Sequence, residues 1–513
     1  MNVLELDPAP TLLKRLRSEL AALFDAQRPI RVSRAPGRLD VMGGIADYTG
    51  SLVCEMPLGV GTAVAIQERH DRQIHVVSLN LLDDHVPFQL GMSLDALAAA
   101  SAEGLRRELA QPGRKWAGYV LGCLFLLHEK GHVDLADPRI RGLNIALYST
   151  VPSGGGVSSS AALEVATMVG LVEHFKIASL APRGAKLKQI AVSRWEWEGG
   201  AVLPATSQAG GAMPAPLVES GMRLARLCQE AENRIVGAPC GIMDQVTCHL
   251  GQPGMLLRLL CQPHELLPPL PLPEGVKVAG IFTGVRHDVS GDAYGRTRAA
   301  AFMGHRMILD QMRRLGREAG LTMTGDPTNG YLANLPIDDY KALFRPVLPE
   351  TITGEAFLEQ FGQHGDTATT VQPGEVYPVR DACDHHVLDA QRVRRFAGFL
   401  ENEVATDRGR ALRSAGRLMH ASHHSYGEHA RLGHPAADVI VGLVRKQEAE
   451  GLYGARITGG GGGGTVAVLM EATERADGAI ASILAAYERE TGHVPTLLDS
   501  TSPGSAHVGT ALA

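Results

Sequence analysis

The part of this 513-residue chain best suited to chemistry is a run of glycines and serines. Residues 151–168 read Val-Pro-Ser-Gly-Gly-Gly-Val-Ser-Ser-Ser-Ala-Ala-Leu-Glu-Val-Ala-Thr-Met, between a strand-like segment (143–148) and an alanine-rich helical pattern. Glycines let the backbone approach a ligand closely. The unpaired amides and positive dipole end of a starting helix attract an anion, most often a phosphate. No lysine follows as the P-loop motif requires, so the run predicts phosphate binding by another arrangement, with a tight strand-to-helix turn as the alternative.

Two carboxylates farther along the chain could assist a phosphoryl transfer. Glu232 ends an acidic helical segment, and Asp244 follows a backbone shaped by glycine and proline at 237–241. Phosphoryl transfer needs Mg²⁺ on the phosphates and a group near the attacking hydroxyl, and a serine hydroxyl can join a carboxylate as an oxygen ligand of Mg²⁺. We therefore take Glu232 and Asp244 as candidates for these roles. Taken singly, each would more often be a helix cap or a surface charge.

Two further segments could shape the same site. Residues 34–48 are rich in turn formers and contain Arg38 and Asp47 as a candidate ion pair, although a structured turn with a surface pair would look the same. Six consecutive glycines, 459–464, match the G-x-G-x-x-G pattern trivially, which carries no information. Apolar strand-like flanks at 455–457 and 466–469 favour a tight glycine turn inside a domain over a flexible linker.

Other reactive residue types give weaker signals. The histidines between 420 and 429 complete no metal-binding spacing, which favours an ordinary helix surface. Cys383, His385 and His386 lack the glycine turn or oxyanion element that a cysteine nucleophile would need.

Composition limits the partners and the compartment. The formal net charge is only −6 and there is no Lys/Arg-rich block, so neither nucleic acid nor an anionic membrane is expected as a main partner. The seven cysteines are scattered without a C-x-x-C, which indicates reduced thiols. The start of the chain lacks a signal-peptide pattern, and the longest apolar run, 117–127, is far below the ~18–20 residues that span a bilayer. We expect a cytoplasmic protein.

The pattern of elements predicts an α+β protein of at least two domains, since single cores rarely exceed roughly 250–300 residues. Helices are expected at 11–26, 115–128, 158–174, 224–235, 296–315, 389–404 and 408–424, and strands at 30–33, 63–67, 74–78, 143–148 and 276–282. Residues 195–221 show neither the helical nor the strand-like spacing of apolar residues and are interpreted as a surface insertion. The proline-rich passage 263–273 is interpreted as a linker between two domains.

Taken in order, these segments resemble the GHMP kinases, the family that includes galactokinase, homoserine kinase and mevalonate kinase. Ala35-Pro36-Gly37-Arg38 looks like the first family motif, 152–162 like the second and 458–464 like the third. The resemblance implies a domain like ribosomal protein S5 domain 2 at 1–270 and a ferredoxin-like domain at 271–513. The active site would lie in the cleft between them, where ATP and a small-molecule substrate meet.

Within the family, the sugar-kinase branch fits best. The stretch 237–245 is similar to galactokinases, but Gly44 and Ile45 stand where those enzymes have Glu and His in Gly-Glu-His-Thr-Asp-Tyr. An apolar wall penalises an unpaired hydroxyl, so it would favour L-arabinopyranose, which lacks the C6 hydroxymethyl group of galactose. The stretch 34–48, with Leu260-Cys261-Gln262-Pro263 and 502–504, is most similar to L-arabinokinases. A galactokinase and a non-catalytic sugar sensor are the alternatives.

The resemblance also assigns roles. Asp244 and Arg38 would be catalytic, with Arg38 keeping Asp244 ionised. Mg²⁺ would be held by Ser159, Ser160 and Glu232. The substrate-binding residues it implies are Asp47, Gly44, Ile45, Gly241 and Tyr294. The ATP-binding residues it implies are Gly154, Gly155, Gly156, Val157, Ser158, Ser159, Ser160, Gly460 and Gly461. The protein would act as a monomer or homodimer.

Overall fold

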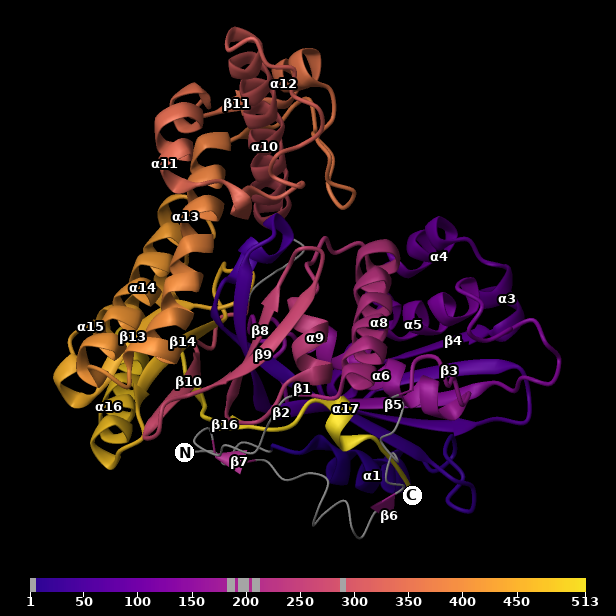
Figure 1. Cartoon of the computed structure of the whole chain (residues 1–513). Coiled ribbons are helices and arrows are strands. Elements are labelled where there is room, and N and C mark those ends of the chain that lie inside the picture. The colour runs from indigo at the N-terminus through magenta and orange to yellow at the C-terminus, as the bar shows by residue number, and fades with distance from the viewer. Residues whose placement is uncertain (1–5, 182–189, 192–202, 205–212, 287–291) are drawn as a thin grey trace.

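The computed structural model describes residues 6–181, 190–191, 203–204, 213–286 and 292–513. It has a large mixed sheet with helices, a smaller antiparallel sheet with helices, and a helical lobe that projects beyond both (Figure 1). The α+β fold class predicted from the sequence is confirmed.

The large sheet runs in the order β4-β3-β5-β2-β1-β17-β6, with β8 and β9 continuing from one end of the long strand β2. Most of its neighbours are antiparallel, whereas β3 with β5 and β17 with β6 are parallel. Its strands are β1 (Arg31–Met42), β2 (Leu52–Glu68), β3 (Gln73–Ser78), β4 (Gln89–Ser93), β5 (Leu143–Ser149), β6 (Ile190–Ala191), β8 (Met255–Leu260), β9 (Glu265–Pro271) and β17 (Thr510–Leu512).

The helices of this part lie on the sheet because their apolar faces complete its core. Helices α5 and α6 and the strands β1 and β2 supply much of one continuous hydrophobic cluster. The helical elements are α1 (Pro8–Glu19), the 3-10 turn η1 (Gly44–Thr49), α2 (Leu79–Asp83), α3 (Leu94–Ala99), α4 (Ala102–Leu109), η2 (Lys115–Ala117), α5 (Gly118–Glu129), α6 (Ser159–His174), α8 (Ala215–Ala231), the π-turn η4 (Glu232–Val236), α9 (Met243–Leu250) and α17 (Ser505–Val508).

The small sheet has the order β13-β14-β10-β15 and is antiparallel throughout. Helices α14, α15 and α16 pack on it around a second apolar cluster. These elements are β10 (Val276–Phe282), β13 (Leu452–Ile457), β14 (Thr465–Glu471), β15 (Thr496–Leu498), α14 (Arg408–Glu428), α15 (Pro435–Arg445), η9 (Glu448–Glu450) and α16 (Glu474–Thr491). The chain then returns to the large sheet, where β17 pairs with β1.

The helical lobe has its own apolar cluster, and α13 connects it to the small sheet (Figure 1). It comprises α10 (Asp292–Glu318), η5 (Leu332–Asn334), α11 (Ile337–Asp339), η6 (Tyr340–Phe344), η7 (Arg345–Val347), β11 (Ile352–Thr353), α12 (Gly354–Phe361), β12 (Val376–Tyr377), α13 (Val379–Gly398) and η8 (Phe399–Glu403). Among the described helices, none combines the length and the hydrophobicity needed to cross a bilayer.

Two interpretations of the sequence need correction. The passage 263–273 is not a free linker, because β9 (265–271) pairs antiparallel with β8 along the sheet. The expected insertion at 195–221 ends earlier, since α8 begins at Ala215. Within that insertion, 195–202 and 205–212 lie outside the described residues, and Leu203–Pro204 forms the short strand β7, which pairs with β16 (Ser500–Thr501).

Candidate active site

Strand β1 brings Arg38 to the glycine–serine turn. The register of β1 against β2 shifts between Pro36 and Arg38, and such irregularities redirect side chains. The Arg38 amide donates to the carbonyl of Val157 (3.1 Å), and its Nη1 donates to the carbonyl of Gly156 (2.9 Å). The first and second predicted motifs are therefore in direct contact.

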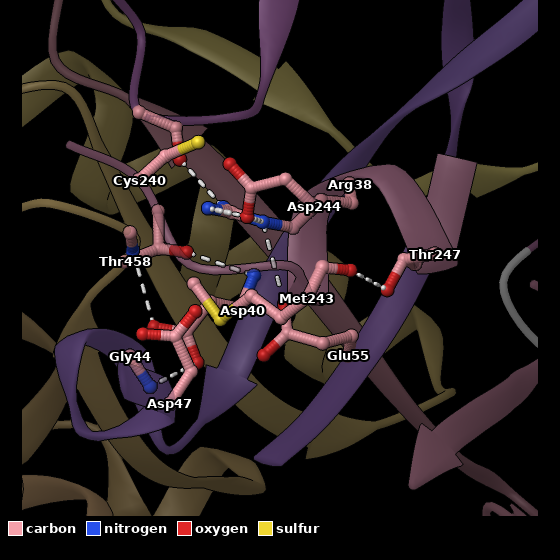
Figure 2. Close-up of polar contacts among 12 residues, drawn as sticks. Arg38, Asp40, Gly44, Asp47, Glu55, Cys240, Met243, Asp244, Thr247 and Thr458 are labelled. Carbon is pink, nitrogen blue, oxygen red and sulfur yellow. Dashed lines mark hydrogen bonds and ion pairs between the residues drawn. The ribbon is translucent and has the colours of Figure 1, made fainter. Parts of the chain in front are cut away.

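The Arg38 guanidinium also holds Asp244, which lies in the first turn of α9 (Figure 2). Nε and Nη2 of Arg38 lie 2.8 and 2.7 Å from Asp244 Oδ1. Burial lowers the pKa of Arg38, but Asp244, Glu55 and Asp40 together raise it above its ordinary value, so the guanidinium stays charged. The Arg38–Asp47 ion pair considered from the sequence is not formed; Arg38 pairs with Asp244 instead.

The glycine–serine turn leaves the start of α6 open to a ligand. Gly154 and Gly156 have φ of 65° and 69°, and Ser158 is also left-handed, with φ 62°. Helix α6 begins at Ser159 without a side-chain cap, and the buried Ser158 hydroxyl has no hydrogen-bond partner among the described residues. Uncapped amides and an unpartnered hydroxyl are what an anion needs. Residues 154–160 therefore fit a phosphate cradle.

Glu232 lies beside this turn, close enough to Ser160 for that side chain to favour the ionised form of its carboxyl group. Burial, and then the nearby charge of Asp244, raise the pKa of Glu232 to about 7, while hydrogen bonds from Cys240 and Ser160 oppose the rise. The carboxylate also accepts from Gln245 Nε2 at 2.8 Å. A cation here would offset the cost of a buried negative charge, and carboxylate and hydroxyl oxygens are the donors that Mg²⁺ prefers. Glu232 and Ser160, with Ser159 next to them in α6, fit a magnesium site.

A different group of metal-ligating types meets in the helical part of the molecule. Asp381, Asp384 and His429 bring ligand atoms within 4.8 Å of one another among the described residues. Arg431 binds Asp381 at 2.8 Å, and Arg345 binds Asp384 at 2.8 Å. Because both carboxylates are already paired with arginines, we assign no metal there.

The six-glycine turn packs against the first glycine turn, as its apolar flanks suggested. It joins β13 to β14, and Thr465 Oγ1 donates to the carbonyl of Gly155 at 2.7 Å. A Cβ on Gly464 would lie 2.6 Å from the Gly155 carbonyl oxygen, and one on Gly459 would lie 2.6 Å from that of Gly156. Only glycine permits this approach, since both positions also have positive φ. Gly460 and Gly461 follow Gly459 in the same turn, and Gly461 itself packs against Leu432.

A cavity of about 390 Å³ lies between the large-sheet domain and the helical lobe. Its lining residues are Asp47, Tyr48, Gln229, Cys240, Gly241, Ile242, Cys261, Pro263, His264, Arg298, Phe302, Gly330, Tyr331, Gly365, Asp366 and Thr367. Any side chain at position 241 would overlap the Asp47 carboxylate. Burial, and then the charge of Asp244, raise the pKa of Asp47 to about 7, against the attraction of Arg298.

Three residues predicted to contact the substrate lie behind this cavity instead. A Cβ on Gly44 would overlap the Tyr426 hydroxyl, and the Ile45 side chain is 1% exposed, within the cluster of the small sheet. The Ile45 amide donates to the same Tyr426 hydroxyl at 2.9 Å. Tyr294 is buried edge-to-face against Tyr48, with ring centroids 6.1 Å apart. Gly44, Ile45 and Tyr294 are not among the residues that line the cavity.

The helical lobe supplies cavity residues that the sequence did not reveal. Arg298 on α10 forms a two-point ion pair with Asp366, at 2.9 and 2.7 Å, and its Nη1 donates to the Pro239 carbonyl. Its guanidinium also lies over the Tyr48 ring, 4.8 Å from the centroid. Arg298 lies four residues after Tyr294, and this spacing on one helix face was a weak indication that Arg298 belongs to the site. Asp366 is part of no sequence motif that would have identified it.

Asp40 is a second buried carboxylate that escaped the sequence interpretation. Its Oδ1 accepts from the Gly44 amide (Figure 2). Its Oδ2 accepts from Arg456 Nη1 (2.8 Å) and from the Gly459 amide (3.1 Å). Both Asp40 and Arg456 are fully buried. The ion pair joins β1 to β13, and the Gly459 amide adds a contact from the six-glycine turn, so Asp40 links the two domains at the site.

Three family models match the chain: GHMP kinases N terminal domain at 118–194, galactokinase galactose-binding signature at 18–68, and GHMP kinases C terminal at 403–489. With the fold and the two glycine turns, these matches show that the chain belongs to the GHMP kinase family.

Within that family, the similarity is to sugar kinases. The L-arabinokinase of Arabidopsis thaliana is 32% identical over 504 residues, which cover 89% of this chain but 44% of that protein. The galactokinase of Chloroflexus aggregans is 28% identical, with 88% of this chain and 86% of that protein covered. In fold, the chain is similar to Lactococcus lactis galactokinase complexed with galactose, with a TM-score of 0.65 and 20% identity over 97% of this chain and 99% of the other.

Proposed function

We propose that this chain is an ATP-dependent sugar 1-kinase and that L-arabinose is its substrate. One observation carries the proposal: the Arg38–Asp244 pair lies between the glycine–serine turn and Asp47, a residue of the 390 Å³ cavity. A phosphoryl donor and a polyhydroxylated acceptor could therefore be held on opposite sides of one carboxylate. The similarity to sugar kinases supports this assignment.

Each group then has a defined task. The backbone amides of 154–160 would cradle the phosphates, with Gly460 and Gly461 closing over them. Ser159, Ser160 and Glu232 would hold Mg²⁺, which neutralises charge on the phosphates when bound. Asp47, against Gly241, would accept hydrogen bonds from sugar hydroxyls. These tasks use the groups that the two glycine turns and the cavity bring together.

Asp244 would orient the anomeric hydroxyl and take its proton. Arg38 binds that carboxylate through Nε and Nη2 and lies where charge would develop on the transferred phosphoryl group. Because the transition state of phosphoryl transfer is loose, the proton need not leave early. Positioning of the hydroxyl is therefore the larger part of the role of Asp244.

The choice of L-arabinose rests on the 32% identity to an L-arabinokinase and on Gly44 and Ile45 in place of the galactokinase Glu and His. Since both residues lie behind the cavity, they would act through the position of η1, which carries Asp47, rather than as a wall. Galactokinase activity is the second candidate, favoured by the galactokinase signature at 18–68. The ratio of kcat/KM for L-arabinose and D-galactose distinguishes the two, and a clear preference for galactose would overturn our choice.

Substitution of Asp244 tests the assigned chemistry. We expect Asp244→Ala to bind ATP as the wild type does and to lose turnover by roughly 10²–10⁴-fold, the usual contribution of a positioned base. ATP binding is measured by calorimetry and turnover by sugar-dependent ADP release. Asp338→Ala, at an exposed aspartate of α11, is the matched control and should leave both unchanged. Near-normal turnover in Asp244→Ala would contradict the proposed role.

A further inference from the structure

Glu55 is a buried glutamate next to the Arg38–Asp244 pair that the proposed mechanism leaves without a task. It lies on β2, where the antiparallel register sets it directly opposite Asp40 on β1. Its side chain is 0% exposed, and its Oε2 lies 3.4 Å from Arg38 Nε (Figure 2). A substitution at this position would therefore act at the centre of the site.

The surroundings of Glu55 do little to stabilise a charged carboxylate, although Arg38 Nε lies 3.4 Å from its Oε2. Neither of its oxygens accepts a hydrogen bond from a described residue. The Arg38 Nε–H is directed at Asp244 Oδ1, 2.8 Å away. A buried charge without hydrogen bonds is costly, and two like charges directly opposite each other on paired strands repel.

Asp40 is the better site for the negative charge of this pair of carboxyl groups. It already accepts bonds from Arg456, Gly44 and Gly459, whereas Glu55 accepts none. The two carboxyl groups are buried and stand directly opposite each other on paired strands, so one proton held by the pair removes the repulsion between two like charges. We propose that Glu55 is a positioning residue. It is a neutral carboxylic acid next to Arg38, so it does not compete with Asp244 for the ion pair with the guanidinium.

The electrostatics of the neighbouring elements agree with this geometry. Burial first, and then Asp40, raise the pKa of Glu55 well above its ordinary value, although Arg38 opposes the rise. The other charged group facing it is Asp244 on α9, which also raises its pKa. The thiols of Cys54, Cys248 and Cys261 face it as neutral groups, because burial raises their pKa values.

The consequence is a dependence of turnover on pH. When Glu55 loses its proton, as the pH rises past its raised pKa, it competes with Asp244 for Arg38, and the hold on the catalytic carboxylate weakens. The inference rests on the proposed function for this kinetic part. We expect kcat for the sugar to fall as the pH rises past the Glu55 pKa and to level off at a lower value once Glu55 is fully ionised.

Glu55→Gln keeps the shape of the side chain and cannot ionise. It should retain the turnover that the wild type has below the Glu55 pKa and lose the decline that the wild type shows above it. Glu164→Gln is the matched control: Glu164 is also fully buried with a raised pKa, but it contacts Gln245 rather than Arg38. This control should keep that decline, whatever its turnover. A decline that persists in Glu55→Gln, or a loss of activity there as severe as that of Asp244→Ala, would overturn the proposal.

A second measurement needs no turnover. Folding takes up a proton at a group whose pKa is raised, so the wild type loses stability as the pH rises from about 4.3, the unfolded value, toward the folded pKa. The difference in Tm between Glu55→Gln and the wild type should therefore grow with pH over that window. A constant difference would show that Glu55 is charged in the folded protein and would overturn the proposal. If the chain phosphorylated no sugar, turnover would be absent while this trend in Tm remained, so failure of the proposed function would be recognised separately.

Discussion

At the scale of single residues, the site is controlled by carboxyl groups whose charge depends on burial. Asp47, Glu55, Glu164 and Glu232 are all buried, and burial is the largest cause of the raised pKa of each. For Asp47 and Glu232 the resulting value is about 7. Small changes in pH near neutrality should therefore change how the site binds its ligands.

Asp47 gives the first prediction at this scale. A carboxylate accepts hydrogen bonds from sugar hydroxyls better than a carboxylic acid does, and Asp47 becomes protonated below its pKa of about 7. The dissociation constant of the sugar, measured by calorimetry without ATP, should rise as the pH falls from 8 to 6, by up to about tenfold per unit below the pKa. Asp47→Asn should bind the sugar more weakly and without this dependence.

Glu232→Gln is the control for that titration, because Glu232 has a similar pKa but lies at the glycine–serine turn. Its sugar dissociation constant should follow pH as the wild type does. Sugar affinity that was independent of pH in the wild type would show that Asp47 does not contact the sugar through its charge.

Which residues could be recognised from the sequence depended on their neighbours in the chain. Arg38, Glu232 and Asp244 stand within or beside glycine- and proline-shaped turns, and the structure brings them together. Glu55 and Asp366 enter the site through strand pairing and through the fold of the helical lobe, which their sequence neighbours do not reveal. The departure at Gly44 and Ile45 was visible, but their burial behind the cavity was not, because it depends on packing against Tyr426.

At the scale of elements, the contact between the two glycine turns is the feature to test. Thr465 Oγ1 donates to the carbonyl of Gly155 inside the protein. Thr465→Val keeps the shape but leaves that carbonyl unpaired, which costs about 1–3 kcal/mol. We expect a raised KM for ATP with little change in the KM for the sugar, measured by steady-state ADP release. Equal changes in both constants would contradict a specific role for this contact on the phosphate side.

The elements themselves were largely predictable where apolar periodicity was strong. The strand predicted at 276–282 is β10 (Val276–Phe282), and the helix predicted at 158–174 is α6 (Ser159–His174). The prediction of a linker at 263–273 was wrong because it was based on the prolines in this passage. Among the described strands, β9 pairs with β8 alone, and an edge strand tolerates prolines because it has a side without ladder hydrogen bonds.

At the scale of the whole molecule, a buried ion pair links the large-sheet and small-sheet domains. Arg456, at the end of β13, binds Asp40 on β1 at 2.8 Å, and both side chains are 0% exposed. Arg456→Met leaves Asp40 with an uncompensated charge and should destabilise the protein by about 3–5 kcal/mol. Thermal unfolding measures the change.

The control for that prediction is an exposed ion pair of the same types. Arg475 binds Glu450 at the surface, so Arg475→Ala should leave the unfolding temperature unchanged within error. Equal, small effects of the two substitutions would show that the Asp40–Arg456 pair does not hold the domains together.

The most direct test of the proposed function is sugar-dependent ADP release by the wild-type chain. The purified protein is given ATP and Mg²⁺ with a panel of sugars that includes L-arabinose and D-galactose, and the product is identified by phosphorus NMR. We predict ADP release that depends on L-arabinose, with the phosphate on the anomeric oxygen. ADP release that no sugar stimulates, or a phosphate on any other hydroxyl, would contradict the assignment as a sugar 1-kinase.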